Sequence, residues 1–267
     1  MPLQHAERFN FFPASPFCCV TSVFVGDLHL IEQEEEMERP WTGARIPDLA
    51  FSGAQLKPMT SWSPGETYVI VVAFYPDALV EMTGVDLSPF TGCVAAAERA
   101  LPRQVLEPCR RFFEAARREE IDEGFSHLEA EFGAMWVSMR PAARSTKRIK
   151  DWKKSLVRRA ALVGSGHSTR QIARRVRSWT GVSERDLQGL GHTEEFYVRL
   201  HEAIGKGNVD WASLAAASGF ADQPHMIKQV RRHTGFTPDQ LRRHARDDET
   251  FWGYRLLGRY FDKTQGQ

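Results

Sequence analysis

Residues 210–242 read DWASLAAASGFADQPHMIKQVRRHTGFTPDQLR, and this stretch decides the fold of the C-terminal half. A short run of small residues stops at Gly219, and a second segment with a polar face begins after Asp222. Asp222 is a good helix N-cap, and Met226 and Val230 fall on one apolar stripe of a helix. A short helix, a turn that contains glycine and a second helix with a polar face together predict a helix-turn-helix.

The same pattern occurs 54 residues earlier in the chain. Arg177–Ser183 reads RSWTGVS, and Arg231–Thr237 reads RRHTGFT. The apolar frame also aligns upstream of these segments, and Ser168 takes the place of the capping residue Asp222. Self-similarity of this kind is typical of a repeated supersecondary unit. We therefore expect another helix-turn-helix that begins near Leu156, with a looser turn between its helices.

In each unit the polar and basic side chains are left for the outward face of the second helix. Clustered cations on one face of a domain favour a polyanion as the partner. A solvated basic face without a partner is the alternative. The predicted contact residues are Thr169, Arg170, Arg174, Arg175, Arg177, Gln223, His225, Lys228, Gln229, Arg231 and Arg232.

The net charge of +1 hides a division of the chain into acidic and basic parts. Residues 1–139 hold 10 basic and 21 acidic residues, a net charge of −11. Residues 140–246 hold 22 basic and 9 acidic residues, a net charge of +13. Such a division suggests two domains with different partners.

The N-terminal half changes from a strand pattern to a helix pattern after Pro76. TYVIVVAFY at Thr67–Tyr75 is the strongest strand, and its continuous apolar run predicts burial on both faces or a place in a barrel wall. In the helix region, one apolar stripe at helical spacing consists of Leu106, Cys109, Phe112, Phe113 and Ala116. The remaining expected elements are strands in 17–31 and 40–64 and helices at 95–101, 105–120 and 125–139.

Together these patterns predict an α+β fold. A domain of mixed strands and helices, sensory or dimerising in role, is expected in residues 1–140. The break at Arg140-Pro141 separates it from an all-α DNA-binding domain with two helix-turn-helix units in residues 145–246. Residues 247–267 form a C-terminal extension.

These residues resemble the AraC/XylS family of transcription regulators. The second unit carries the resemblance over the stretch from Leu214 to Arg242, through Leu214-Ala215, Gly219-Phe220, Asp222-Gln223, His225, Val230-Arg231-Arg232, Thr234-Gly235-Phe236, Pro238 and Leu241-Arg242. The first unit matches more weakly, and the resemblance covers about 100 of the 267 residues. It implies two units joined by one long helix, here from about Ser183 to Ile204. It also implies that the two recognition helices enter successive major-groove segments on one face of the DNA.

By this resemblance, base contacts fall to Arg170, Arg174, Gln223, His225 and Lys228. The chain departs from the family pattern in two places. Pro224 stands where many members have a polar or small residue, and its side chain can donate nothing to a base. Gly189 and Gly191 interrupt the joining helix, where they could bend it.

The resemblance implies a sequence-specific, DNA-binding transcription regulator, controlled through its N-terminal domain by a small-molecule effector or a partner. Double-stranded DNA is the expected partner. RNA polymerase, an unknown effector and a second copy of the chain remain open as further partners. An activator role is an expectation, although the residues leave activation and repression open. No cofactor, no metal and no membrane are expected, and the expected location is the cytoplasm.

Other function classes have weaker support. Cys18 or Cys19 with His5 or His29 would be needed for a catalytic Cys–His pair, but no nucleophile motif surrounds them, so no enzyme is predicted. Cys93 and Cys109 complete the set of four cysteines, which we expect to be reduced thiols.

Two further alternatives concern binding. A protein-interaction or effector-binding module could keep the helix-turn-helix scaffold without reading DNA. Trp41, Trp62 and Phe74 could line a ligand pocket, although aromatic residues at such positions are more often part of a core.

Overall fold

The computed structural model describes residues 8–139, 148–163, 168–205 and 209–254. The N-terminal part contains two four-stranded antiparallel sheets, with strand orders β1-β6-β3-β4 and β7-β2-β5-β8. The strands are β1 (Phe9–Phe12), β2 (Cys18–Val25), β3 (His29–Ile31), β4 (Ala44–Arg45), β5 (Leu49–Ser52), β6 (Met59–Trp62), β7 (Tyr68–Phe74) and β8 (Val94–Ala96). Short 3-10 turns (η2, Glu34–Met37; η3, Pro40–Thr42) join β3 to β4.

The strongest predicted strand, β7, lies at the edge of its sheet, and the prediction that both its faces are buried is wrong. Its side chains alternate: Ile70 and Val72 pack against the core and Phe74 is buried, whereas Val71 is 49% exposed. An edge strand pairs on one side only, here with β2. β-Branched residues form strands wherever half of the pleated surface can pack, so an apolar run does not by itself place a strand in the middle of a sheet.

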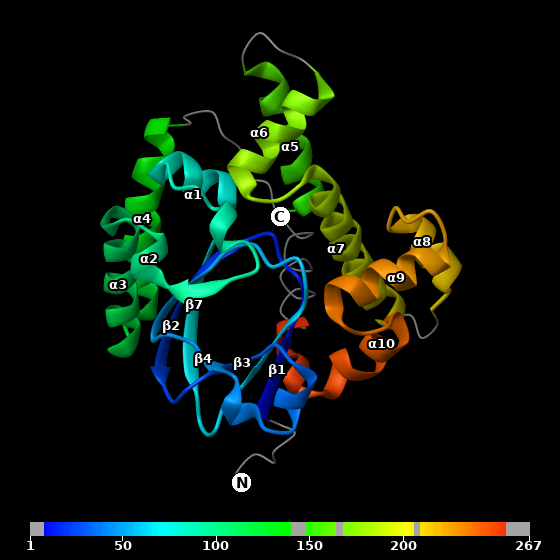
Figure 1. Cartoon of the computed structure of the whole chain (residues 1–267), viewed down its shortest axis with the longest axis horizontal. Coiled ribbons are helices and arrows are strands. Elements are labelled where there is room, and N and C mark those ends of the chain that lie inside the picture. Colours follow the sequence, from blue (N-terminus) through cyan, green and yellow to red (C-terminus); the bar gives the residue numbers. More distant parts are fainter. Residues whose placement is uncertain (1–7, 140–147, 164–167, 206–208, 255–267) are drawn as a thin grey trace.

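Helices cover the β7-β2-β5-β8 sheet and complete its core. They are α1 (Pro76–Thr83), α2 (Ala97–Ala100), α3 (Arg103–Arg117) and α4 (Ile121–Met139), with the turn η4 (Ser88–Phe90) between α1 and β8. All five residues of the predicted stripe on α3 are buried, and four of them belong to the core cluster that also contains Phe51 and Leu79. Figure 1 shows α3 and α4 side by side next to the strands.

The C-terminal part is helical, which confirms the expected α+β fold. It contains α5 (Ile149–Leu162), α6 (Thr169–Thr180), α7 (Glu184–Gly205), α8 (Trp211–Ala217), α9 (Gln223–Thr234), α10 (Pro238–Asp247) and the turn η5 (Glu249–Phe251). The predicted joining helix is α7, which begins and ends within one residue of the expected bounds. No helix in the described part of the chain is both long and apolar enough to cross a membrane.

α7 belongs to two cores at once. Leu187 and Leu190 pack with α5 and α6, and Phe196 and Leu200 pack with α8, α9 and α10. The helix is continuous through Gly189, where a Cβ would lie 3.0 Å from the His233 ring. Gly189 thus permits a close approach between α7 and α9. Figure 1 shows α7 running from the α5–α6 pair to the α8–α9 pair.

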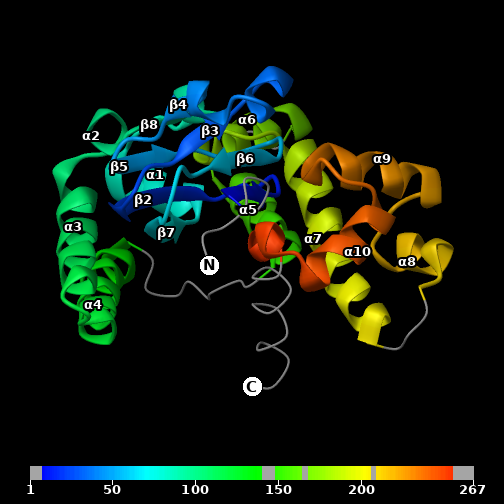
Figure 2. The same cartoon turned by 90° about the horizontal axis from the view of Figure 1, so that it is seen from below.

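The N-terminal and C-terminal parts share their cores. Buried Ala54 and half-buried Phe17 pack with α5, α6 and α7, and Phe11 packs in the cluster of α8–α10. The Ala14 amide donates to the His233 carbonyl at 2.7 Å. Figure 2 shows the strands between the α3–α4 hairpin and the α7–α10 helices. The predicted boundary at 140–145 lies outside the described residues, as do 255–267 of the predicted extension.

Candidate nucleic-acid interface

The first helix of the second unit, α8, has a cap at its start and a left-handed glycine after its end. The Asp210 carboxylate accepts hydrogen bonds from the Ala212 and Ser213 amides at 3.0 and 3.3 Å, so α8 begins there. Gly219 has φ +85°, a conformation that costs a side-chain-bearing residue energy. Ala215 is buried, as expected where α8 packs on α9. The sequence prediction of a short helix stopped by Gly219 is confirmed.

α9 follows the predicted pattern of cap, stripe and stop. The Asp222 carboxylate accepts from the His225 amide at 2.7 Å, and an anion at this end also favours the helix dipole. Met226 and Val230 are fully buried on the inner side. The helix ends at Gly235, whose φ is +80°. These contacts fix which side of α9 faces outward.

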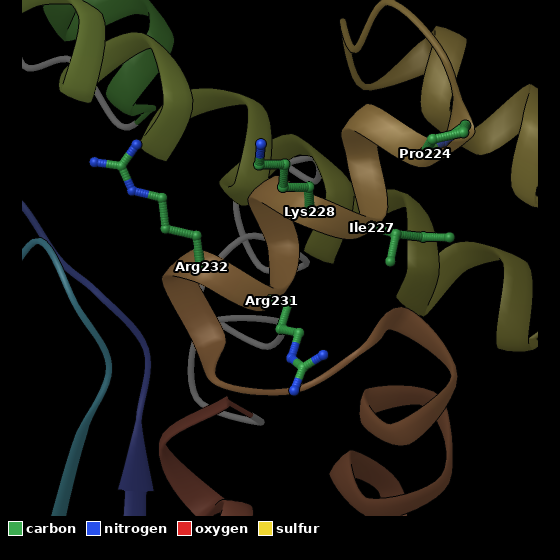
Figure 3. Close-up of a pocket in the computed structure, with 5 residues that line it drawn as sticks. All are labelled: Pro224, Ile227, Lys228, Arg231 and Arg232. Carbon is green, nitrogen blue, oxygen red and sulfur yellow. The ribbon is translucent and has the colours of Figure 1, made fainter.

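The outward side of α9 is an open groove that carries two apolar and three basic residues (Figure 3). We call this surface the α9 outer face. Lys228, Arg231 and Arg232 were predicted as contact residues, whereas Ile227 was missed. Arg232 is turned toward α7, where its guanidinium lies 3.4 Å from the Asp186 carboxylate. The residues of the α9 outer face are Pro224, Ile227, Lys228, Arg231 and Arg232.

The three other predicted residues of α9 are half-buried. The His225 ring accepts the Ala221 amide at Nδ1 (3.3 Å) and lies against Phe220. Gln229 points toward α7, because its Oε1 atom is 3.6 Å from the position of a Cβ on Gly189. Gln223 is the first residue of the helix. These side chains are thus less available to a large ligand than Lys228 or Arg231.

The first unit places its basic residues on the recognition helix in a similar way. Ser168 and Gln171 form a reciprocal capping box at the start of α6, and Val176 is fully buried. Gly181, with φ +72°, ends the helix. The turn at 164–167 lies outside the described residues. Four predicted contact residues are exposed on α6: Thr169, Arg170, Arg174 and Arg177.

Arg175, also predicted as a contact residue, is half-buried where α6 packs on α5. Its Nη1 atom donates to the Ala160 carbonyl of α5 at 2.7 Å, and the residue is half-buried. Positions 172, 175, 176 and 179 share one side of a helix with 3.6 residues per turn, so Arg175 flanks the apolar stripe. The guanidinium therefore helps to pack α6 on α5 instead of facing solvent.

Unpaired positive charge is the main electrostatic property of both outward surfaces. Within the described residues, no carboxylate forms an ion pair with the exposed cations Arg170, Arg174, Arg177, Lys228 and Arg231. Salt bridges elsewhere on the surface, such as Arg111 with Glu131, show that the chain does pair many of its arginines. Cations left unpaired on two helices are available to bind an anionic partner.

Two buried ionisable groups lie behind these surfaces. Burial lowers the pKa of His233 to about 4, and its Nδ1 lies 2.8 Å from the Thr193 hydroxyl of α7. Burial raises the pKa of Glu194 to about 7, although its carboxylate accepts from the Ile149 amide at 2.9 Å. Both groups join α7 to a neighbouring helix, so their role is in packing.

The residues weighed for other functions do not form a site in the described part of the chain. Burial raises the pKa of Cys18 to about 12 and of Cys19 to about 11, which leaves both thiols protonated at neutral pH. His5 lies outside the described residues. Trp41 is exposed, whereas Trp62 and Phe74 are buried in different sheets. Among the described residues, no group of three or more His, Cys, Asp or Glu side chains is placed to hold a metal.

No protein-family model matches this sequence, and no curated protein matches it. Among solved structures, ToxT from Vibrio cholerae is similar over 88% of this chain and 94% of its own, with 11% identity and a TM-score of 0.39. ToxT from Vibrio cholerae O395 covers 90% of this chain and 97% of its own, with 12% identity and a TM-score of 0.39. A ToxT structure with bound unsaturated fatty acid has 12% identity and a TM-score of 0.37.

Proposed function

We propose that this chain is a sequence-specific, DNA-binding transcription regulator of the AraC/XylS type. The observation that carries the proposal is the pair of helices α6 and α9, each second in its unit. Both expose arginine or lysine side chains without an ion-pair partner among the described residues. Exposed cations on a helix that can enter the major groove suit both phosphates and base edges.

The packing of α7 supports a common DNA site for the two units. Val176 of α6 belongs to the same core cluster as Leu187 and Leu190 of α7. On α9, His233 lies 2.8 Å from the Thr193 hydroxyl of α7, and Gln229 approaches Gly189. One helix therefore contacts both recognition helices and holds them in a fixed relative placement, as binding to two segments of the major groove requires.

Each of the two helices would contact both base edges and phosphates, through different side chains. We assign base reading to Arg170 and Arg174 of α6 and to Lys228 of α9. Arg177 and Arg231, three residues further along than Arg174 and Lys228, would contact phosphates, with Thr169 as a further donor near the start of α6. Gln223, His225, Gln229 and Arg232 stay secondary candidates because they are half-buried or paired, and Arg175 is left out because it packs on α5.

The N-terminal part would regulate the DNA-binding helices. Its residues pack against both helix-turn-helix units, so a change in this part can reach either of them. Control by a small-molecule effector, a homodimer, contact with RNA polymerase, activation and a cytoplasmic location belong to the same proposal and follow from the resemblance alone.

A second candidate function is a protein-interaction module that keeps the same scaffold. Exposed Ile227 and Pro224 on the α9 outer face favour it, because apolar side chains on an exposed surface can bind a protein. The two functions differ in their dependence on salt. Binding to DNA releases counterions, whereas binding of an apolar protein surface does not.

Selection from a random duplex library, followed by binding at several salt concentrations, tests the proposal. The two arginines assigned to phosphates, Arg177 and Arg231, contribute about −1.8 to the slope of log K against log salt. Arg177→Ala should weaken binding and flatten this slope by about 0.9. Arg103→Ala on α3 is the matched control, because Arg103 is exposed far from both units along the chain. No enriched sequence, or a slope that Arg177→Ala leaves unchanged, would contradict the proposed function.

A further inference from the structure

The start of the α9 outer face is apolar. Pro224 is the second residue of the helix, and Ile227 is 36% exposed although it is a large aliphatic residue. Figure 3 shows these two side chains at one end of the groove, with Lys228 next and the arginines beyond it. Ile227 does not belong to the cluster around Met226 and Val230. It lies about 100° around the helix from Met226, on the flank of the buried stripe. Core packing therefore does not account for it.

Two polar side chains at this apolar end, Asp222 and His225, are engaged within the protein. The Asp222 carboxylate caps the helix by accepting the His225 amide. The His225 ring accepts the Ala221 amide and rests against Phe220. Pro224 has no amide hydrogen to donate. The exposed surface formed by Pro224 and Ile227 is thus hydrocarbon, and the first exposed cation along the helix is Lys228.

Only one feature of the major groove matches hydrocarbon. Thymine carries a C5 methyl group there, whereas guanine, adenine and cytosine present hydrogen-bond donors or acceptors. The N-terminal residues of a recognition helix are those that reach base edges. We propose that the α9 outer face recognises a thymine, whose methyl group packs on Ile227 beside Pro224. Lys228 then donates to an acceptor on a neighbouring base. This inference rests on the proposed function and adds the base that α9 selects.

Replacement of single thymines by deoxyuridine tests the inference, because this change removes only the methyl group. The probe is the duplex enriched by selection with the wild-type chain. At one thymine in the part of the site bound by α9, we expect affinity to fall about fourfold, the factor that corresponds to one buried methyl group. Ile227→Ala should bind the thymine and deoxyuridine duplexes equally well. Alanine at this exposed position favours the helix, so the fold is retained.

Lys228→Ala is the matched control on the same face. It should bind both duplexes more weakly and keep the fourfold ratio between them. If every thymine can be replaced without loss, or if Ile227→Ala keeps the ratio, the inference is wrong while the proposed function stands. If the wild-type chain enriches no sequence at all, the proposed function fails, and the inference fails with it.

Discussion

The contact between Asp77 and α5 gives the sharpest test of how the two parts of the chain are joined. Asp77, at the start of α1, is 4% exposed. Its carboxylate accepts from the Trp152 indole at 2.8 Å and from the Arg159 guanidinium at 2.6 Å. The Arg159 guanidinium also lies 4.9 Å from the centre of the Trp179 ring on α6. One carboxylate of the N-terminal part therefore orients two side chains of the first unit.

Asp77→Ala should lower the free energy of unfolding by about 3 kcal/mol. A buried indole N–H without an acceptor costs about 1–3 kcal/mol. The Arg159 side chain is 26% exposed, so water partly compensates its lost partner, and this part of the cost is about 1 kcal/mol. A double-mutant cycle with Arg159→Ala isolates the contact between Asp77 and Arg159. The contact between Arg159 and Trp179 cancels in the cycle, because it is present in both proteins that keep Arg159 and absent from both that lack it. We expect a coupling energy of about 1–2 kcal/mol.

Urea unfolding followed by circular dichroism measures each variant of the cycle. Arg111 and Glu131, which join α3 to α4, form the control pair, with side chains 56% and 38% exposed. An exposed pair of this kind couples by about 0.2–1 kcal/mol. A coupling between Asp77 and Arg159 no larger than that of the control pair would refute the closed contact between the two parts.

Met226→Asp should unfold the second unit, because an unpaired carboxylate would be buried at a fully buried position; an unchanged melting temperature would contradict the assigned faces. Glu194 has a folded pKa of about 7, above its unfolded value, so it costs stability progressively as pH rises from 4.5 to 7. Glu194→Gln should therefore gain about 2–3 kcal/mol relative to the wild type between pH 5 and pH 7.5, measured by urea unfolding. His233 has a folded pKa of about 4, below its unfolded value, so the stability that its neutral, buried ring contributes is lost as pH falls from 6.5 to 4. A midpoint above pH 6 for the titration of this ring, followed by NMR, would disprove its burial. Phe11→Ala removes ring contacts at 5.4 and 5.3 Å, and should broaden the distance between spin labels on α6 and α9; an unchanged distribution would show that β1 does not position α9.

Local patterns in the sequence were enough to predict the two recognition helices, whereas α5 begins at Ile149, well before the expected start near Leu156. Caps, glycine stops and apolar stripes act within a few residues, so Ser168, Asp222 and Gly235 marked the ends of α6 and α9 correctly. The long helix α7 followed from the family resemblance alone. The position of Arg175 was open to the same reasoning, because it shares a helix side with Val176, but the basic side chain was given more weight than its position.

Tertiary contacts account for what the sequence could not predict. The run at β7 is equally compatible with an edge and a central strand, and only its single partner β2 decides between them. The acidic and basic halves suggested two domains with different partners, but they gave no sign that Ala54 and Phe17 pack in the core of the first unit. Contacts between residues far apart in the sequence, such as Phe17 and Trp152, leave no periodic pattern in the sequence. Ile227 was missed for a related reason, since its exposure depends on where α9 packs.

The N-terminal part holds the two units through separate contacts, and this separation has a consequence for regulation. The first unit is held by Asp77 at the start of α1, through Arg159 and Trp152. The second is held by β1, through the Ala14 amide on His233 and the Phe11 ring between Phe236 and Phe251. Two rigid helices can fit successive grooves only if their relative placement is fixed, and here α7 and the N-terminal part fix it together. A ligand shifts such an arrangement only as far as it binds one placement better than another. The contacts at β1 and at α1 are the two places where the N-terminal part fixes this arrangement, and Asp77→Ala and Phe11→Ala perturb them one at a time.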